Sequence, residues 1–202
     1  MRHDIMIVGN GEIGETGRVA AAKADFIIRF NECRSYAASP CRTDVVAVCN
    51  TGRPGKRMAE ADEWRNLPAV RDTVEIWSAR DPALFREMRE PLAQTHPELD
   101  DLCDDYTDAF DRFCKISSKQ HVVIDRAIHA FADKAISAFV PPSYVVPSTG
   151  LIAIVETLRR FPSADIALTG FNHTGWAGHP FSVERQIVDQ YVATGSLTRY
   201  DT

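Results

Sequence analysis

Short apolar runs recur along this chain, and most of them are separated by helix-length stretches. The runs cover residues 4–8, 26–30, 44–49, 73–77 and 165–169. A continuous apolar run suits a strand that is covered on both faces, and helix-length connections indicate crossovers between parallel strands. A chain of 202 residues, 45% of them apolar, is large enough for one hydrophobic core. We therefore predict an α/β fold with a single Rossmann-like domain over residues 1–202, in which helices flank a mainly parallel sheet.

The remaining segments predict the other elements. We expect helices over residues 15–25, 121–139, 151–160 and 182–193, and a short last strand within 195–200. Residues 81–140 are polar and helix-rich, and we interpret them as a helical insertion suited to act as a lid. His121 and His129 would share one face of the helix 121–139, but they lack a third ligand, so the pair does not predict a metal site.

The composition excludes several classes of protein. A net charge of −5, with both signs spread along the chain, disfavours nucleic acid as a partner. No stretch approaches the roughly 18–20 apolar residues of a membrane span, and the first apolar run meets glycines too early for a secretory signal. The five cysteines lack the paired spacing of a zinc site, so free thiols are expected. We predict a cytoplasmic protein that needs neither a metal nor another cofactor.

An asparagine follows each of the first three predicted strands. These residues are Asn10, Asn31 and Asn50. In a parallel sheet the carboxyl ends of the strands meet at the edge where α/β proteins bind ligands. The asparagine side chain carries both a donor and an acceptor, so the three amides are predicted to contact the ribose, base edge or phosphate of a nucleotide.

The first predicted strand runs into a glycine-rich loop. Residues 9–14 read G-N-G-E-I-G, which matches the G-x-G-x-x-G fingerprint of dinucleotide-binding proteins. At the end of the second strand, Glu32 would then hold a ribose, or Arg29 a phosphorylated ribose. An NAD(P)-dependent oxidoreductase is therefore one alternative, and a tight turn without any ligand is another.

A second loop, P-S-T-G at 147–150, precedes an apolar helix. Ser148, Thr149 and Gly150 would offer hydroxyls and free N–H groups at a helix N-terminus, which favours an anion such as phosphate. The alternative is an ordinary helix cap.

His179 lies in a third, glycine-rich loop, just after a predicted strand and just before a helix. An imidazole titrates near neutrality and can act there as a general base. The alternative is that His179 packs beside Trp176.

Several of these segments, taken in order, resemble the sialyl motifs of sialyltransferases. They are V-G-N-G at 8–11, R-F-N at 29–31, P-S-T-G-L at 147–151, T-G-F at 169–171 and H-P-F-S-V-E at 179–184. The likeness is closest to glycosyltransferase family 29, is weaker to bacterial family 42, and covers residues 4–50 and 144–197. The chain is also similar to bacterial sequences that are called urease-operon accessory proteins. That name describes the neighbourhood of their genes and not their chemistry.

The resemblance implies a metal-independent, inverting transfer of sialic acid or a related sugar. The donor would be a CMP-sugar, and the acceptor a hydroxyl of a small glycan or other molecule. His179 would be the general base, His173 would assist the departing phosphate, and Glu184 would orient His179 or cap its helix. The donor nucleotide would be bound by Asn10, Gly11, Asn31, Asn50, Ser148, Thr149 and Gly150.

Two further hypotheses stay open beside the transferase. The chain could be a non-catalytic nucleotide-binding accessory protein on the same fold, which would bind CMP without turnover. An oxidoreductase would instead bind NAD or NADP and ignore cytidine nucleotides.

Overall fold

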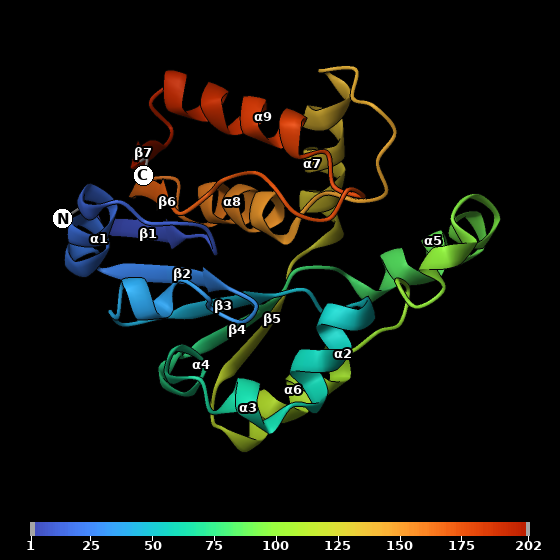
Figure 1. Cartoon of the computed structure of the whole chain (residues 1–202), viewed down its shortest axis with the longest axis horizontal. Helices are drawn as coiled ribbons and strands as arrows, with labels where there is room; N and C mark the ends of the chain where they lie inside the picture. The colour runs from blue at the N-terminus through green and yellow to red at the C-terminus, as the bar shows by residue number, and fades with distance from the viewer. Residues whose placement is uncertain (1–2, 201–202) are drawn as a thin grey trace.

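In the part of the chain that the structure describes, seven parallel strands form one sheet in the order β5-β4-β3-β2-β1-β6-β7. The computed structural model describes residues 3–200. The strands are β1 (Asp4–Val8), β2 (Phe26–Phe30), β3 (Val45–Val48), β4 (Glu75–Ser78), β5 (Gln120–Val123), β6 (Asp165–Thr169) and β7 (Thr198–Tyr200). Helices flank this sheet (Figure 1), which confirms the predicted Rossmann-like α/β fold.

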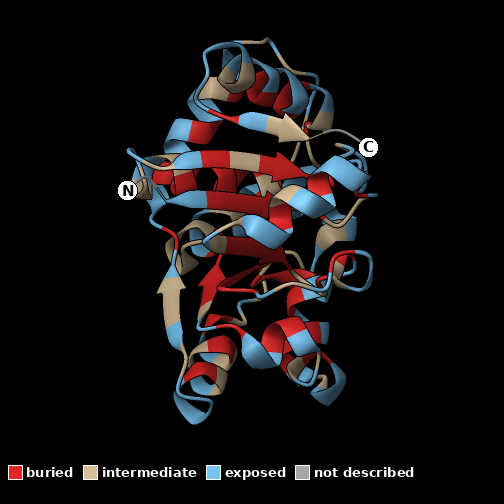
Figure 2. Ribbon diagram, turned by 90° about the vertical axis from the view of Figure 1, so that its left-hand side faces the viewer, coloured by how far each residue is buried: buried red, intermediate tan, exposed pale blue. Residues whose placement is uncertain are grey.

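Helices cover both faces of the sheet because successive strand residues point to opposite sides. Ile5 and Ile7 pack into the large core beneath α7 (Arg126–Ser137), α8 (Thr149–Arg160) and α9 (Phe181–Ala193). Met6 and Val8 belong to a core on the other face, beside α1 (Glu15–Lys23). That face also carries a third core, formed with α2 (Gly52–Glu60), α3 (Asp62–Arg65), α4 (Pro68–Asp72) and α6 (Thr107–Ile116). The buried residues accordingly follow the strands and the sheet-facing sides of the helices (Figure 2).

The remaining helices are short or lie at the margin of the sheet. They are α1 (Glu15–Lys23), η1 (Tyr36–Ala38), α2 (Gly52–Glu60), α3 (Asp62–Arg65), α4 (Pro68–Asp72), α5 (Pro82–Thr95), η2 (Pro97–Leu99) and α6 (Thr107–Ile116). The predicted helices 15–25, 151–160 and 182–193 correspond to α1, α8 and α9, and the predicted last strand corresponds to β7. Helix α5 extends away from the sheet (Figure 1), and with η2 it forms an arm over residues 82–99.

The predicted helix over 121–139 is wrong in its first part. Residues 120–123 form the edge strand β5, and α7 begins only after Asp125, whose carboxylate accepts a hydrogen bond from Ala127 N at 2.7 Å. The β-branched run 122–124 favours a strand over a helix. His121 and His129 therefore lie on different elements, and residues 81–140 contribute a strand to the sheet besides their helices.

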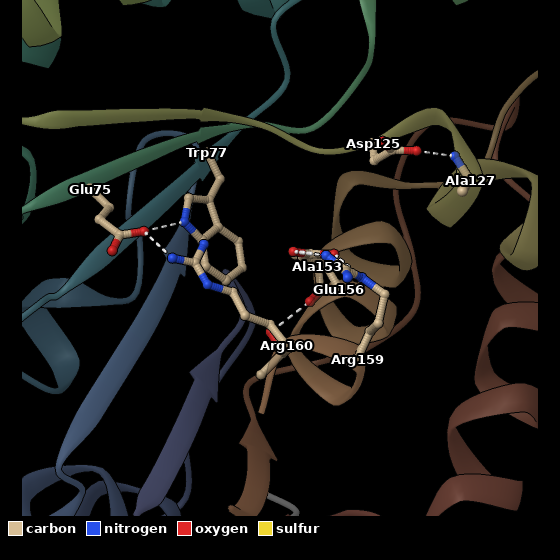
Figure 3. Close-up of polar contacts among 9 residues, drawn as sticks. Glu75, Trp77, Asp125, Ala127, Ala153, Glu156, Arg159 and Arg160 are labelled. Atoms are coloured by element: carbon tan, nitrogen blue, oxygen red, sulfur yellow. Dashed lines mark hydrogen bonds and ion pairs between the residues drawn. The ribbon is translucent and has the colours of Figure 1, made fainter. Parts of the chain in front are cut away.

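The C-terminal end of α8 is fixed to β4 (Figure 3). The Glu75 carboxylate accepts a hydrogen bond from the Trp77 indole at 2.8 Å and forms an ion pair with Arg160 at 3.4 Å. The Arg160 guanidinium also lies over the Trp77 ring, 5.2 Å from its centre. Because this end of α8 is held at the amino-terminal edge of the sheet, its N-terminus reaches the opposite edge, where the predicted site residues gather.

Candidate functional site

A cavity of about 400 Å³ opens at the carboxyl ends of β3 and β4. Its walls come from the loop after β3, the end of β4, the arm 82–99, α7, the N-terminus of α8 and the loop before α9. The lining includes Cys49, Asn50, Thr51, Arg53, Ala79, Arg80, Met88, Leu99, Leu102, His129, Val146, Thr149, Ile152, Trp176 and His179. Of the predicted site residues, Asn50, Thr149 and His179 therefore share one cavity.

The N-terminus of α8 is held by a buried carboxylate. Ser148 is the N-cap, and its Oγ accepts a hydrogen bond from Leu151 N at 3.1 Å. Glu184, only 2% exposed, accepts from Ser148 N at 2.7 Å and from Ser148 Oγ at 2.6 Å. Burial raises the pKa of Glu184, against the two smaller effects of these bonds. Glu184 thus fixes the loop 147–150, and within residues 3–200 it forms no hydrogen bond with His179. Thr149 remains as the loop hydroxyl in the cavity wall.

His179 is oriented by a backbone carbonyl. Its Nδ1 lies 2.8 Å from Val146 O, and because a carbonyl only accepts, the neutral ring carries its proton on Nδ1. Its Nε2 then has a free lone pair. Burial lowers the pKa of His179, with a smaller opposing effect of the Val146 bond, so the ring is neutral at pH 7. Trp176 packs edge-on against His179 at 4.9 Å, so this histidine both packs beside Trp176 and lines the cavity.

A second neutral histidine lies in the same wall. His129 donates from Nε2 to Ala79 O at 2.8 Å, and burial lowers its pKa to about 4. Sequence reasoning set this residue aside. No local motif surrounds it, and only the packing of α7 against the end of β4 brings it to the cavity.

The three asparagines each bond to the end of the next strand along the sheet. Asn10 Nδ2 donates to Phe30 O at 3.2 Å. Asn31 Oδ1 accepts from Cys49 N at 2.8 Å, and Asn50 Oδ1 accepts from Arg80 N at 3.0 Å. The amides thus link the ends of β1, β2, β3 and β4 in series. Asn50 is fully buried, and Asn10 and Asn31 lie outside the cavity lining.

The glycine loop is packed against the end of β6. Gly9 N donates to Thr169 O and Gly11 N to Gly170 O, both at 2.9 Å. A Cβ on Gly11 would lie 2.8 Å from Gly170 O, so protein backbone occupies the space next to this glycine. Glu32 forms an ion pair with Arg57. These contacts support the tight-turn interpretation and give the dinucleotide hypothesis no support.

His173 lies apart from the cavity lining. Its backbone has a φ of 50°, and its ring packs near Phe171 at 6.1 Å. Within residues 3–200 its buried Nε2 has no hydrogen-bond partner, and burial lowers its pKa to about 4. Gly150 and Gly11 are also absent from the lining, as are Ser148 and Glu184 behind it.

Arg80 is a further cavity residue that sequence reasoning missed. It follows β4 just as the asparagines follow the three preceding strands, so the rule that identified them would have identified Arg80 as well. Arg80 gives the cavity a cationic group beside the two neutral histidines.

Metal-binding groups are not assembled in the part of the chain that the structure describes. No cluster of three or more His, Cys, Asp or Glu side chains there is arranged to hold a metal ion. Of the acidic residues 100–105, Asp101 pairs with Arg53 at 2.9 Å and Asp104 with Arg89 at 3.4 Å. The five cysteines are free, as predicted. None of the helices within residues 3–200 has the length and apolar character needed to cross a bilayer.

Comparison with solved structures finds sialyltransferases. The chain aligns over 98% of its length with 69% of a mammalian sialyltransferase solved in complex with Gal-beta-1-3GalNAc-ortho-nitrophenol, with a TM-score of 0.57 and 13% identity. It aligns over 98% of its length with 79% of the Campylobacter jejuni sialyltransferase CstII in complex with cytidine-5'-monophosphate, with a TM-score of 0.54 and 13% identity. This confirms the predicted resemblance at the level of the fold.

Comparison by sequence identifies a nearer relative. No family model matches the chain. Over 197 residues, 96% of this chain and 91% of the relative, it is 45% identical to the urease operon 23 kDa accessory protein of Rhizobium meliloti (strain 1021). At that identity and coverage, the chain belongs to the family of the urease operon 23 kDa accessory protein.

Proposed function

We propose that this chain is a non-catalytic, nucleotide-binding accessory protein of a urease operon, built on a sialyltransferase-type fold. The name of its 45% identical relative supports the accessory role. The likeness of its fold to sialyltransferases, one of them bound to cytidine-5'-monophosphate, supports a cytidine nucleotide as the ligand. In this role it acts in the cytoplasm and needs no metal.

The observation that carries this proposal is which of the site residues line the cavity and which bond to other parts of the chain. Asn10, Asn31 and Ser148, which the resemblance assigns to the donor, bond to other parts of the chain. Thr149 at the N-terminus of α8 and Arg80 remain in the cavity wall. A helix N-terminus and a guanidinium favour a phosphate, so the cavity is suited to hold the phosphate of a nucleotide. His173 and Glu184, to which the resemblance gives roles in the transfer step, lie outside the cavity lining.

Calorimetric titration with CMP in the presence of EDTA tests this function. We expect saturable binding by CMP, none by NAD, and no release of sialic acid from CMP-sialic acid above the rate in buffer. Thr149→Ala should weaken CMP binding, whereas Thr194→Ala, at an exposed position after α9, should not. Absence of CMP binding, or turnover of the CMP-sugar, would contradict the proposal.

His179 favours the transferase as a second candidate. Its neutral ring presents a lone pair on Nε2 in the cavity wall, as a general base requires. It would take the proton from an acceptor hydroxyl as the sugar leaves the CMP phosphate with inversion. In that case His179→Gln would abolish transfer to a glycan acceptor and leave CMP affinity unchanged, which separates the base from a binding residue.

A further inference from the structure

Arg80 is a half-buried cation that has no ion-pair partner among the described residues. Within residues 3–200 no carboxylate forms an ion pair with it, and its buried Nε has no hydrogen-bond partner. The guanidinium interacts instead with two polarisable groups: one Nη lies 3.6 Å from the Met88 sulfur, and the guanidinium carbon lies 6.0 Å from the centre of the Phe85 ring. Arginine stays protonated in proteins, so this side chain carries a full positive charge in the cavity wall.

The backbone at Arg80 is clamped from two sides. The Asn50 amide accepts from Arg80 N at 3.0 Å and donates to Arg80 O at 2.9 Å. His129 donates to the preceding carbonyl, Ala79 O, at 2.8 Å. Both clamping side chains are at most 4% exposed. The guanidinium is thus attached to a rigid strand end, which lowers the entropic cost of using it to bind a ligand.

The surroundings of Arg80 select the kind of group it can bind. Met88, Leu99 and Leu102 from the arm and the loop after it form an apolar wall of the cavity. A buried charge is costly unless it is paired, and a guanidinium pairs best with a planar or tetrahedral oxyanion. The N-terminus of α8, at Thr149, is a second positive pole in the same cavity.

We propose that Arg80 binds a second oxyanion of the ligand, a phosphate or a carboxylate, while the N-terminus of α8 binds the first phosphate. This inference rests on the proposed nucleotide-binding function and adds to it that the ligand carries two anionic groups. The second oxyanion has two possible sources, the β-phosphate of a nucleoside diphosphate and the carboxylate of an acidic sugar. Asn50 and His129 act as positioning residues for Arg80.

Ligand pairs and a matched variant test this inference. CMP, CDP and CMP-sialic acid are titrated into the wild type, Arg80→Gln and Arg126→Gln. Arg126 lies outside the cavity lining, is paired with Glu87 at 3.1 Å and has a side chain that is 54% exposed. We expect CDP or CMP-sialic acid to bind the wild type and R126Q at least about tenfold more tightly than CMP, as charge-assisted hydrogen bonds typically allow. In R80Q that ratio should fall to about one, and Arg80→Lys should restore part of it.

The outcomes separate this inference from the function on which it rests. If CDP binds more tightly than CMP, the second oxyanion is a phosphate, and if CMP-sialic acid binds more tightly than CMP, it is a carboxylate. Equal affinities for all three ligands in the wild type would overturn the role of Arg80. The same holds if folded R80Q still binds either ligand more tightly than CMP. If no cytidine ligand binds, the proposed nucleotide-binding function fails. The role of Arg80 as an oxyanion-binding residue is then tested separately with pyrophosphate. A thermal shift with pyrophosphate in the wild type and R126Q but not in R80Q supports the oxyanion site, and any other pattern refutes it. Cooperative unfolding of R80Q, followed by circular dichroism, shows that the variant is folded.

Discussion

His129 makes the folded protein sensitive to acid. Its folded pKa of about 4 lies below the ordinary histidine value of 6.5, so between these values the unfolded chain binds a proton that the folded chain excludes. Stability is therefore complete above pH 6.5 and is lost as the pH falls toward 4. We expect this residue to remove about 3 kcal/mol of unfolding free energy across that window, measured by urea unfolding at pH 7 and pH 4.

A pair of glutamine variants assigns that effect. His129→Gln keeps an amide that can donate to Ala79 O, and it should flatten the pH dependence. His96→Gln, in the exposed arm, should leave it unchanged. If H129Q loses stability in acid as steeply as the wild type does, another buried group, such as His173, carries the effect.

Arg80 should cost the unliganded protein stability. Burial lowers the pKa of its guanidinium, since desolvation disfavours the charge more than the distant Asp133 favours it. An apolar side chain of similar length would keep the contacts with Phe85 and Met88 without that cost. We expect Arg80→Met to raise the unfolding free energy by about 1 kcal/mol, measured in urea without ligand. A loss of stability instead would show that the guanidinium contributes to packing.

The linked asparagines set the spacing of the strand ends that border the cavity. Asn31 is informative because its Oδ1 satisfies Cys49 N and its φ of 52° is one that asparagine and aspartate tolerate well. Asn31→Ala should cost about 2 kcal/mol, from an unpaired N–H and from backbone strain. Asn31→Asp keeps the acceptor and should cost less than half as much. Equal costs for the two variants, measured by chemical unfolding, would contradict the linking role.

Most strands were predictable because a short stretch of sequence is enough to show their apolar character. The runs at β1, β2, β3 and β6 are continuous and apolar, as expected of strands covered on both faces. β5 was missed because it is an edge strand with exposed ends, Gln120 and Val123, and a histidine in its middle. Its pairing with β4 is a tertiary contact that no short pattern encodes.

The location of the site was predictable from the sequence, but the hydrogen-bond partners of its side chains were not. The rule that ligands gather where parallel strands end located Asn10, Asn31 and Asn50 at one edge of the sheet. A free amide looks the same in sequence whether a ligand or a neighbouring backbone satisfies it. The same limit applies to Glu184, whose bonds to Ser148 join positions that only the folded chain brings together.

The cavity is assembled from segments that are distant in the chain, and Glu184 holds one of its walls in place. Glu184→Ala would leave Ser148 N without its acceptor and would open a small void. We expect a loss of about 2 kcal/mol in unfolding free energy, together with weaker binding of CMP. Glu184→Gln keeps one acceptor and should retain most of both properties. If E184A is as stable as the wild type and binds CMP equally well, the loop 147–150 does not depend on this carboxylate.

The position of Glu184 in α9, which follows the strands β1 to β6, also bears on synthesis. The strands β1 to β5 can pair while the chain is still being translated, because each follows its neighbour in order. The N-terminus of α8, however, receives its anchor only after α9 has left the ribosome. A nascent chain that stalls before α9 would therefore carry the strands β1 to β6 but neither β7 nor a finished cavity. Ligand binding would then distinguish molecules that contain α9 from stalled ones.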